Sequence, residues 1–174
     1  MNIPMFYDYL TRARRDLWTF LESLPDEVLA RAVIPGERFH CIKDLVLHIA
    51  AVEDSWIHED LLRDTPVWEN APGLEGAQDG PFYGDKPLGL LLNYWQAVEK
   101  STLEYLDKLT PEELSRIVAV DSSKGIHYFV LEGLLWHVMG HEVRHTAQIA
   151  VLSRQMDFKP PPQDFLFYLP SRNP

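Results

Sequence analysis

Two histidines and a glutamate near the carboxyl end of the chain have a spacing that can bind a metal ion. Within WHVMGHEVRHTAQI, residues 136–149, His141, Glu142 and His145 form the pattern H-E-x-x-H. On a helix, side chains four residues apart lie on one face about 6 Å from each other, so both imidazoles can reach one ion. Zinc proteases use this pattern, with the glutamate as general base. Two ligands do not complete a site, because tightly bound Zn²⁺ takes at least three.

The sequence that follows the pattern lacks the third ligand of a zinc protease. Beyond His145 there is no further His or Glu, and the only carboxylates are Asp157 and Asp164. The position six residues after His145, where one large class of these enzymes has its third histidine, is Val151. A zinc protease is therefore kept only as a minor alternative.

An upstream histidine is the better candidate for the third ligand. In CIKDLVLHIAAVEDSW, residues 41–56, His48 lies on the apolar stripe of a predicted helix. A single histidine in that position is ordinarily a core residue satisfied by a hydrogen bond. Three unpaired imidazoles on two apolar stripes would each cost about 1–3 kcal/mol, whereas one ion satisfies all of them. We therefore predict a metal site made by His48, His141 and His145.

Four further side chains are candidates for supporting roles. His137 is one turn before His141, but ligands at three successive turns of one helix would span about 12 Å, so we expect His137 outside the coordination sphere. Asp44 could hold the ring of His48, or could favour the start of its helix. Glu142, Asp44 and Glu53 are weak candidates for a general acid or base, and Glu142 points about 100° away from His141 around the helix.

Four segments with helical periodicity must position these residues. They cover about residues 3–24, 42–63, 87–109 and 130–156, and each carries one apolar stripe. Such a pattern predicts an all-α protein folded as a four-helix bundle. His141 and His145 occupy stripe positions where a bundle core normally has Leu or Val.

The connections between these segments also carry predictions. The long loop from Thr65 to Asp85, between the second and third helices, contains Trp68, Phe82 and Tyr83, and we expect it near the metal site or at a subunit contact. The segment TPEEL, residues 110–114, predicts a short helical turn capped by Thr110. Residues 116–130 predict a short extended hairpin before the fourth helix.

Composition narrows the class of protein. With 174 residues and 46% apolar side chains, residues 1–174 are expected to form a single domain. A formal net charge of −10 disfavours nucleic acid and anionic membranes as partners. The densest basic group, Arg12, Arg14 and Arg15, is typical of a solvated helix face. A single cysteine, Cys41, and the absence of a signal peptide or membrane span favour the cytoplasm.

Two of the predicted helical segments resemble a known family. LVLHIAAVEDSW, residues 45–56, followed by LLWHVMGHEVRHTAQIAVLSRQM, residues 134–156, is similar to the DinB/YfiT-like family of metal-binding four-helix bundles, as is the C-terminal DFLFYL. The resemblance spans nearly the whole chain and implies a metal held by His48, His141 and His145. It also implies a homodimer. Where members often have H-H-R-G-Q, this chain has Arg144, His145, Thr146, Ala147 and Gln148.

The resemblance and the chemistry of three imidazoles imply a metal-dependent enzyme. One divalent ion, Zn, Ni, Fe or Mn, would activate water or a low-molecular-weight thiol for a small-molecule substrate. The expected activity is that of a hydrolase or a thiol S-transferase. The alternative is a non-catalytic dimeric module in which the metal joins the helices.

Overall fold

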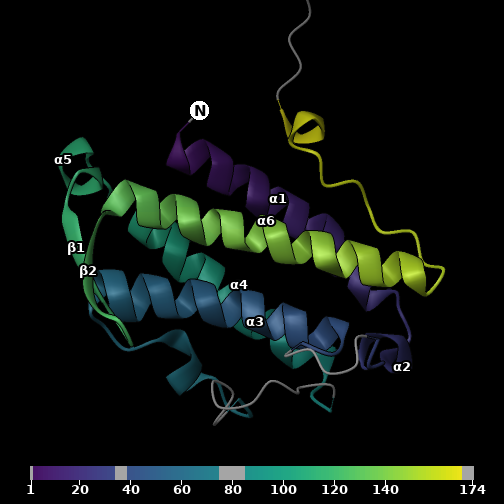
Figure 1. Cartoon of the computed structure of the whole chain (residues 1–174). Coiled ribbons are helices and arrows are strands. Elements are labelled where there is room, and N and C mark those ends of the chain that lie inside the picture. Colours follow the sequence, from purple (N-terminus) through teal and green to yellow (C-terminus); the bar gives the residue numbers. More distant parts are fainter. Residues whose placement is uncertain (1, 34–38, 75–84, 170–174) are drawn as a thin grey trace, which may run out of the picture.

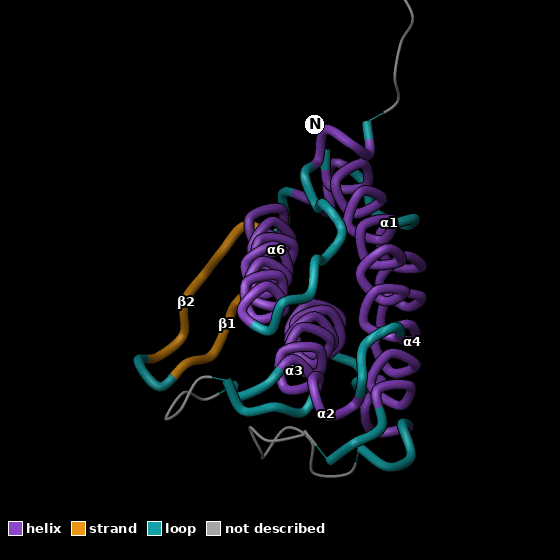
Figure 2. The backbone as a smooth tube through the Cα atoms, turned by 90° about the vertical axis from the view of Figure 1, so that its right-hand side faces the viewer, coloured by secondary structure: helices purple, strands orange, loops and turns teal. Residues whose placement is uncertain are grey.

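Four long helical segments make up most of the computed structural model, which describes residues 2–33, 39–74 and 85–169. They are α1 (Ile3–Glu22), α3 (Ile42–Asp54) with its continuation η1 (Ser55–Leu62), α4 (Leu88–Leu106) and α6 (Leu131–Gln155). The helices lie side by side as a bundle, with α3 between α4 and α6 (Figures 1 and 2). The predicted four-helix bundle is confirmed. The short helices are α2 (Asp26–Leu29), η2 (Val67–Asn70), α5 (Pro111–Leu114) and η4 (Phe165–Tyr168).

The first helix illustrates how local sequence sets these elements. The side chain of Asn2 caps α1 by accepting a hydrogen bond from the backbone N–H of Met5. Proline is tolerated in the first turn, where its missing N–H has no helical partner. Tyr7, Leu10, Leu17 and other residues three or four apart are buried, so one stripe of α1 faces the bundle.

The second long segment departs from the expected single α-helix. Regular α-helix ends at Asp54, and residues Ser55–Leu62 form a π-helical stretch that ends at Arg63 in the left-handed conformation, with φ of 57°. A π-helical stretch shifts the side chains that follow it around the helix axis, and such stretches are frequent at functional sites. The α-helical periodicity of the sequence therefore does not predict which way the side chains after Asp54 point.

A two-stranded antiparallel hairpin precedes α6, as predicted. Strand β1 (Ile117–Ser122) pairs with β2 (Gly125–Val130), and the register places Ile117 opposite Val130 and Ser122 opposite Gly125. Gly125 closes the turn with φ of 109°, a backbone conformation that a residue with a Cβ rarely adopts.

The short helix before the hairpin is capped as expected. The hydroxyl of Thr110 accepts a hydrogen bond from the backbone N–H of Glu113 at 3.2 Å, and Pro111 is the first helical residue of α5. The predicted cap at Thr110 is confirmed.

A buried layer of charged side chains lies between two apolar clusters of the core. Arg14 of α1, only 1% exposed, pairs with Glu53 of α3 at 2.7 Å, Glu99 of α4 at 3.0 Å and Glu142 of α6 at 2.6 Å. The exposed guanidinium of Arg15 also binds Glu99. The prediction that this basic group is a solvated helix face is wrong for Arg14, whose charge is matched by carboxylates from three other helices.

The described parts of the 65–85 loop are attached to the end of α3. The backbone N–H groups of Val67 and Trp68 donate to the carboxylate of Asp54 at 2.9 and 3.0 Å. Phe82 and Tyr83 lie outside the described residues, so the location of this loop near the metal site or at a subunit contact stays a prediction. After α6 the chain runs back along α1, where η4 contacts that helix (Figure 1). None of the described helices combines the length and the apolar character that crossing a membrane requires.

Candidate metal centre

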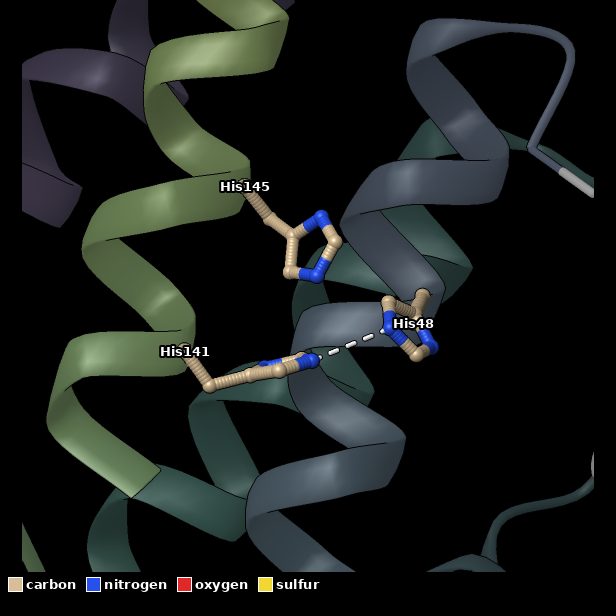
Figure 3. A group of neighbouring side chains, drawn as sticks. All are labelled: His48, His141 and His145. Carbon is tan, nitrogen blue, oxygen red and sulfur yellow. Dashed lines mark hydrogen bonds between the residues drawn. The ribbon is translucent and has the colours of Figure 1, made fainter. Parts of the chain in front are cut away.

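The bundle brings the three predicted histidines together. His141 and His145, one turn apart on α6, point towards His48 on the facing side of α3 (Figure 3). The Nε2 atoms of His141 and His48 are 3.1 Å apart, and one ligand nitrogen from each ring lies within 4.8 Å of the other two. The ring centroids are separated by 4.3 to 4.8 Å.

This spacing fits a single ion. Two nitrogens bound tetrahedrally to Zn²⁺ at its usual bond length lie about 3.3 Å apart, close to the separation of His48 and His141. Within the described part of the chain, no fourth His, Cys, Asp or Glu joins the group. Three protein ligands leave a position for a small molecule, which is the usual arrangement of catalytic rather than structural zinc.

The environment keeps the imidazoles in the form that binds metal. Burial, together with the charges of His145 and His48, lowers the pKa of His141 to about 3. Burial also lowers the pKa of His145, although its hydrogen bond to Gln148 opposes this. Neutral imidazole has a lone pair to offer, whereas imidazolium has none.

Two neighbours orient the ligand rings. Nδ1 of His145 is 2.5 Å from the side-chain oxygen Oε1 of Gln148, so Nδ1 carries the proton and Nε2 is left for metal. The ring of Phe39 lies against that of His48, with 4.0 Å between centroids and 30° between planes. Gln148 was not predicted to support the site, although its position three residues after His145 places it on the same helix face.

The carboxylates considered as acid or base are engaged elsewhere. Glu142 makes a two-point ion pair with Arg14, at 2.7 and 2.6 Å, and Glu53 binds Arg14 and Tyr7. The glutamate of the H-E-x-x-H pattern is thus on the α1 side of α6, whereas the two histidines face α3. A zinc protease needs that glutamate at the metal, so the geometry does not support this alternative.

Asp44 and His137 occupy different surroundings. The carboxylate of Asp44 accepts hydrogen bonds from the backbone N–H groups of His40 at 2.9 Å and Cys41 at 3.3 Å, which caps the start of α3. The ring of His137 lies 5.3 Å from that of Trp56 and 6.5 Å from that of His141.

A cavity of about 650 Å³ lies beside His137, between η1, the hairpin and α6. Its apolar lining includes Trp56, Phe129 and Leu134, and polar atoms come from Asp121 and other residues. His137 lines this cavity and is the residue that links it to the histidine cluster, since its ring lies 6.5 Å from that of His141. The lining does not include His48, His141 or His145.

Comparisons with known proteins agree with this architecture. The family model described as DinB family matches residues 1–173. No curated protein matches the chain. Among solved structures, the chain is similar to a conserved protein from Enterococcus faecalis, with a TM-score of 0.72, 18% identity, and coverage of 88% of this chain and 96% of that one.

Two other solved structures share the fold. A DinB-like protein from Bacillus cereus has a TM-score of 0.61 and 20% identity, over 90% of this chain and 94% of that one. YfiT from Bacillus subtilis has a TM-score of 0.63 and 20% identity, over 90% of this chain and 89% of that one. YfiT is described as a probable metal-dependent hydrolase with an unusual four-helix bundle topology.

Proposed function

The chain belongs to the DinB family, and from that premise we propose that it is a metal-dependent hydrolase in which His48, His141 and His145 hold one divalent ion. One observation carries the proposal: ligand nitrogens from three imidazoles, on two helices, lie within 4.8 Å of one another. The description of YfiT as a probable metal-dependent hydrolase supports the reaction class.

A divalent ion bound there would supply Lewis acidity and lower the pKa of a bound water or thiol, giving a nucleophile near neutral pH. The protein's own residues keep His141 and His145 neutral, hold the three imidazoles at the required separation, and fix the tautomer of His145 through Gln148. The cavity beside His137 would receive the substrate, and its lining of Trp56, Phe129 and Leu134 favours a substrate with an apolar body.

The metal content of the purified protein tests whether the site binds an ion. Protein purified without a histidine tag should contain one equivalent of divalent metal, and His48→Ala should lose it as fully as His141→Ala or His145→Ala, since each removes a third of the protein ligands. His137→Ala should weaken metal binding by about 10–100-fold at most. The three-histidine site is wrong if His48→Ala retains a full equivalent of tightly bound metal.

Turnover separates an enzyme from a non-catalytic metal-joined module. The non-catalytic module is favoured by the observation that the histidines connect α3 to α6. A screen of small amides and thiols as substrates should reveal activity that disappears with the metal and returns with it. Metal binding without any such turnover would favour the module.

A homodimer is proposed as well, because the hairpin exposes large apolar side chains. Ile117, Ile126 and Tyr128, which the register places on one face of the hairpin, are 58%, 57% and 70% exposed, and apolar groups clustered on a surface often mark an interface. Light scattering should give twice the chain mass, and Tyr128→Ser should shift the protein towards monomer. A monomeric wild type at micromolar concentration would exclude this dimer.

A further inference from the structure

A serine, a histidine and an aspartate are hydrogen-bonded in sequence on the side of α3 that faces α4. Nδ1 of His58, in η1, lies 2.7 Å from Oδ1 of Asp54, at the end of α3. Nε2 of the same ring lies 2.7 Å from Oγ of Ser101, in α4. The order carboxylate, imidazole, hydroxyl is that of a Ser-His-Asp catalytic triad, which is recognised by geometry and not by position in the chain.

Asp54 has the surroundings of the buried member of such a triad. Its side chain is fully buried and accepts four hydrogen bonds: from His58, from the backbone N–H groups of Val67 and Trp68, and from the hydroxyl of Tyr94 at 2.7 Å. Four donors around one carboxylate hold it in place as a hydrogen-bond acceptor. Asp54 can therefore orient the ring of His58 and stabilise it when it gains a proton.

The proton positions on His58 follow from this pairing. Because Asp54 only accepts, Nδ1 of His58 carries the hydrogen, and Nε2 presents its lone pair to the hydroxyl of Ser101. The hydrogen bond to Asp54 raises the pKa of His58, against the opposing effect of burial. A histidine of this kind is a better proton acceptor than a free imidazole.

The three residues adjoin a second cavity. A space of about 800 Å³ runs along α4 and is lined by His58 and Ser101, with Leu90, Tyr94, Glu104 and Lys108 among its other residues. Its size is that of a typical small-molecule site. The cavity is bounded by α4, η1 and η2, whereas the metal-binding histidines lie where α3 faces α6.

We propose that Ser101 is the nucleophile of a second catalytic site, with His58 as its general base and Asp54 as a positioning residue, and that this site cleaves uncharged carboxylic esters. The mixed apolar and polar lining suits a neutral ester. Glu104 and Asp64 in the lining disfavour an anionic substrate. The proposal is independent of the metal centre.

The reaction balances with groups that are present. Oγ of Ser101 forms a bond to the ester carbonyl carbon while its proton passes to Nε2 of His58. The bond to the leaving alkoxide then breaks, and the alkoxide takes that proton and departs as the alcohol. Water attacks the acyl-serine with His58 again accepting a proton, and the carboxylic acid leaves as Ser101 recovers its hydrogen. Lys108, which follows the end of α4, is the cation of the lining that can stabilise the oxyanion.

Covalent labelling tests the nucleophile directly. The full-length protein is treated with a fluorophosphonate, and the modified residue is located by mass spectrometry. Wild type should be labelled at Ser101, with the rate reduced at least about 100-fold in His58→Gln and the adduct absent in Ser101→Ala. Ser123→Ala is the matched control, because Ser123 is exposed in the hairpin turn and should not alter the rate.

Hydrolysis of p-nitrophenyl acetate distinguishes this site from the metal centre. Turnover should survive removal of the metal by chelation and should fall by about 100-fold or more in Ser101→Ala, which should retain the wild-type circular dichroism. Asp54→Asn should lower kcat, and its remaining activity should show an altered pH profile. The proposal is overturned if Ser101 is not labelled under conditions that label a known serine esterase, or if His58→Gln is labelled as fast as wild type. The hydrogen-bond chain would then only secure η1 and η2 to α4.

Discussion

At the scale of single residues, identical side-chain types take opposite roles according to their partners. Arg12 and Arg14 are two positions apart on α1, yet Arg12 pairs with Asp8 at the surface and Arg14 is buried among three glutamates. A buried charge is tolerated only when paired, and removing its partner leaves the others uncompensated.

We therefore expect Arg14→Met to lower the free energy of unfolding by about 3–5 kcal/mol, because three buried carboxylates would lose their shared cation. The matched control is Arg12→Met, which breaks an ion pair with side chains 48% and 63% exposed and should cost less than about 1 kcal/mol. Urea unfolding measures the free energy of unfolding of both variants. Equal losses in the two variants would show that Arg14 is not balancing the buried carboxylates.

His58 gives a prediction about pH. Its pKa in the folded protein is raised, first by the hydrogen bond to Asp54 and further by the charges of Asp54 and Asp64, while burial lowers it. Glu104 of α4 and Lys108, which follows α4, line the same cavity. A raised pKa means that the protonated ring stabilises the fold fully below its unfolded value of about 6.5, and that this contribution is lost as pH rises through the folded pKa.

The free energy of unfolding of wild type should therefore exceed that of His58→Gln by more at about pH 5.5 than at about pH 8.5. Urea titrations of both proteins at the two pH values provide the comparison. A difference between the proteins that is constant with pH would mean that His58 has no raised pKa.

At the scale of elements, backbone conformation decides what a substitution does. Gly125 closes the hairpin with φ of 109°, whereas Gly133 lies inside α6, and neither position has an atom within 4 Å of an added Cβ. Space is available at both sites, so the backbone alone distinguishes them.

Gly125→Ala should destabilise the protein by about 1 kcal/mol or more, because alanine rarely adopts a positive φ. Gly133→Ala should stabilise it by about 0.5–1 kcal/mol, because alanine loses less conformational freedom in a helix. Chemical denaturation of both variants shows whether the free energy of unfolding rises or falls in each. A stabilised Gly125→Ala would contradict the turn conformation.

At the scale of the whole molecule, α3 is the helix through which the polar sites are connected. His48 faces α6, Glu53 binds Arg14 of α1, and Asp54 binds Tyr94 of α4. Each of these side chains joins α3 to a different neighbour. Loss of metal should therefore weaken the contact between α3 and α6 in particular.

Chelation should lower the melting temperature of wild type by several degrees and scarcely change that of His48→Ala. A ligand present at a thousand times its Kd stabilises by about 4 kcal/mol, and each kcal/mol is worth about 2–4 °C in a chain of this size. Differential scanning fluorimetry measures the shift. An equal response of the two proteins would place the metal elsewhere.

The sequence by itself was enough to predict the bundle, the hairpin before α6 and the cap at Thr110. Helical periodicity, caps and turn residues act between neighbours in the chain, so they can be read without knowing the fold. The same periodicity also made it possible to group His48, His141 and His145. Each occupies an apolar stripe, where an unpaired imidazole would be costly.

The partners across the bundle were decided only by the tertiary structure. Arg14, unlike Arg12, lies on the buried stripe of α1, four residues after Leu10. The sequence still does not identify its three carboxylate partners, because they come from other helices. No motif in the sequence marks His58, yet in the π-helical stretch its ring reaches Ser101, 43 residues away. Periodicity specifies which face of a helix is buried, but the identity of the group opposite depends on how helices distant in sequence pack together.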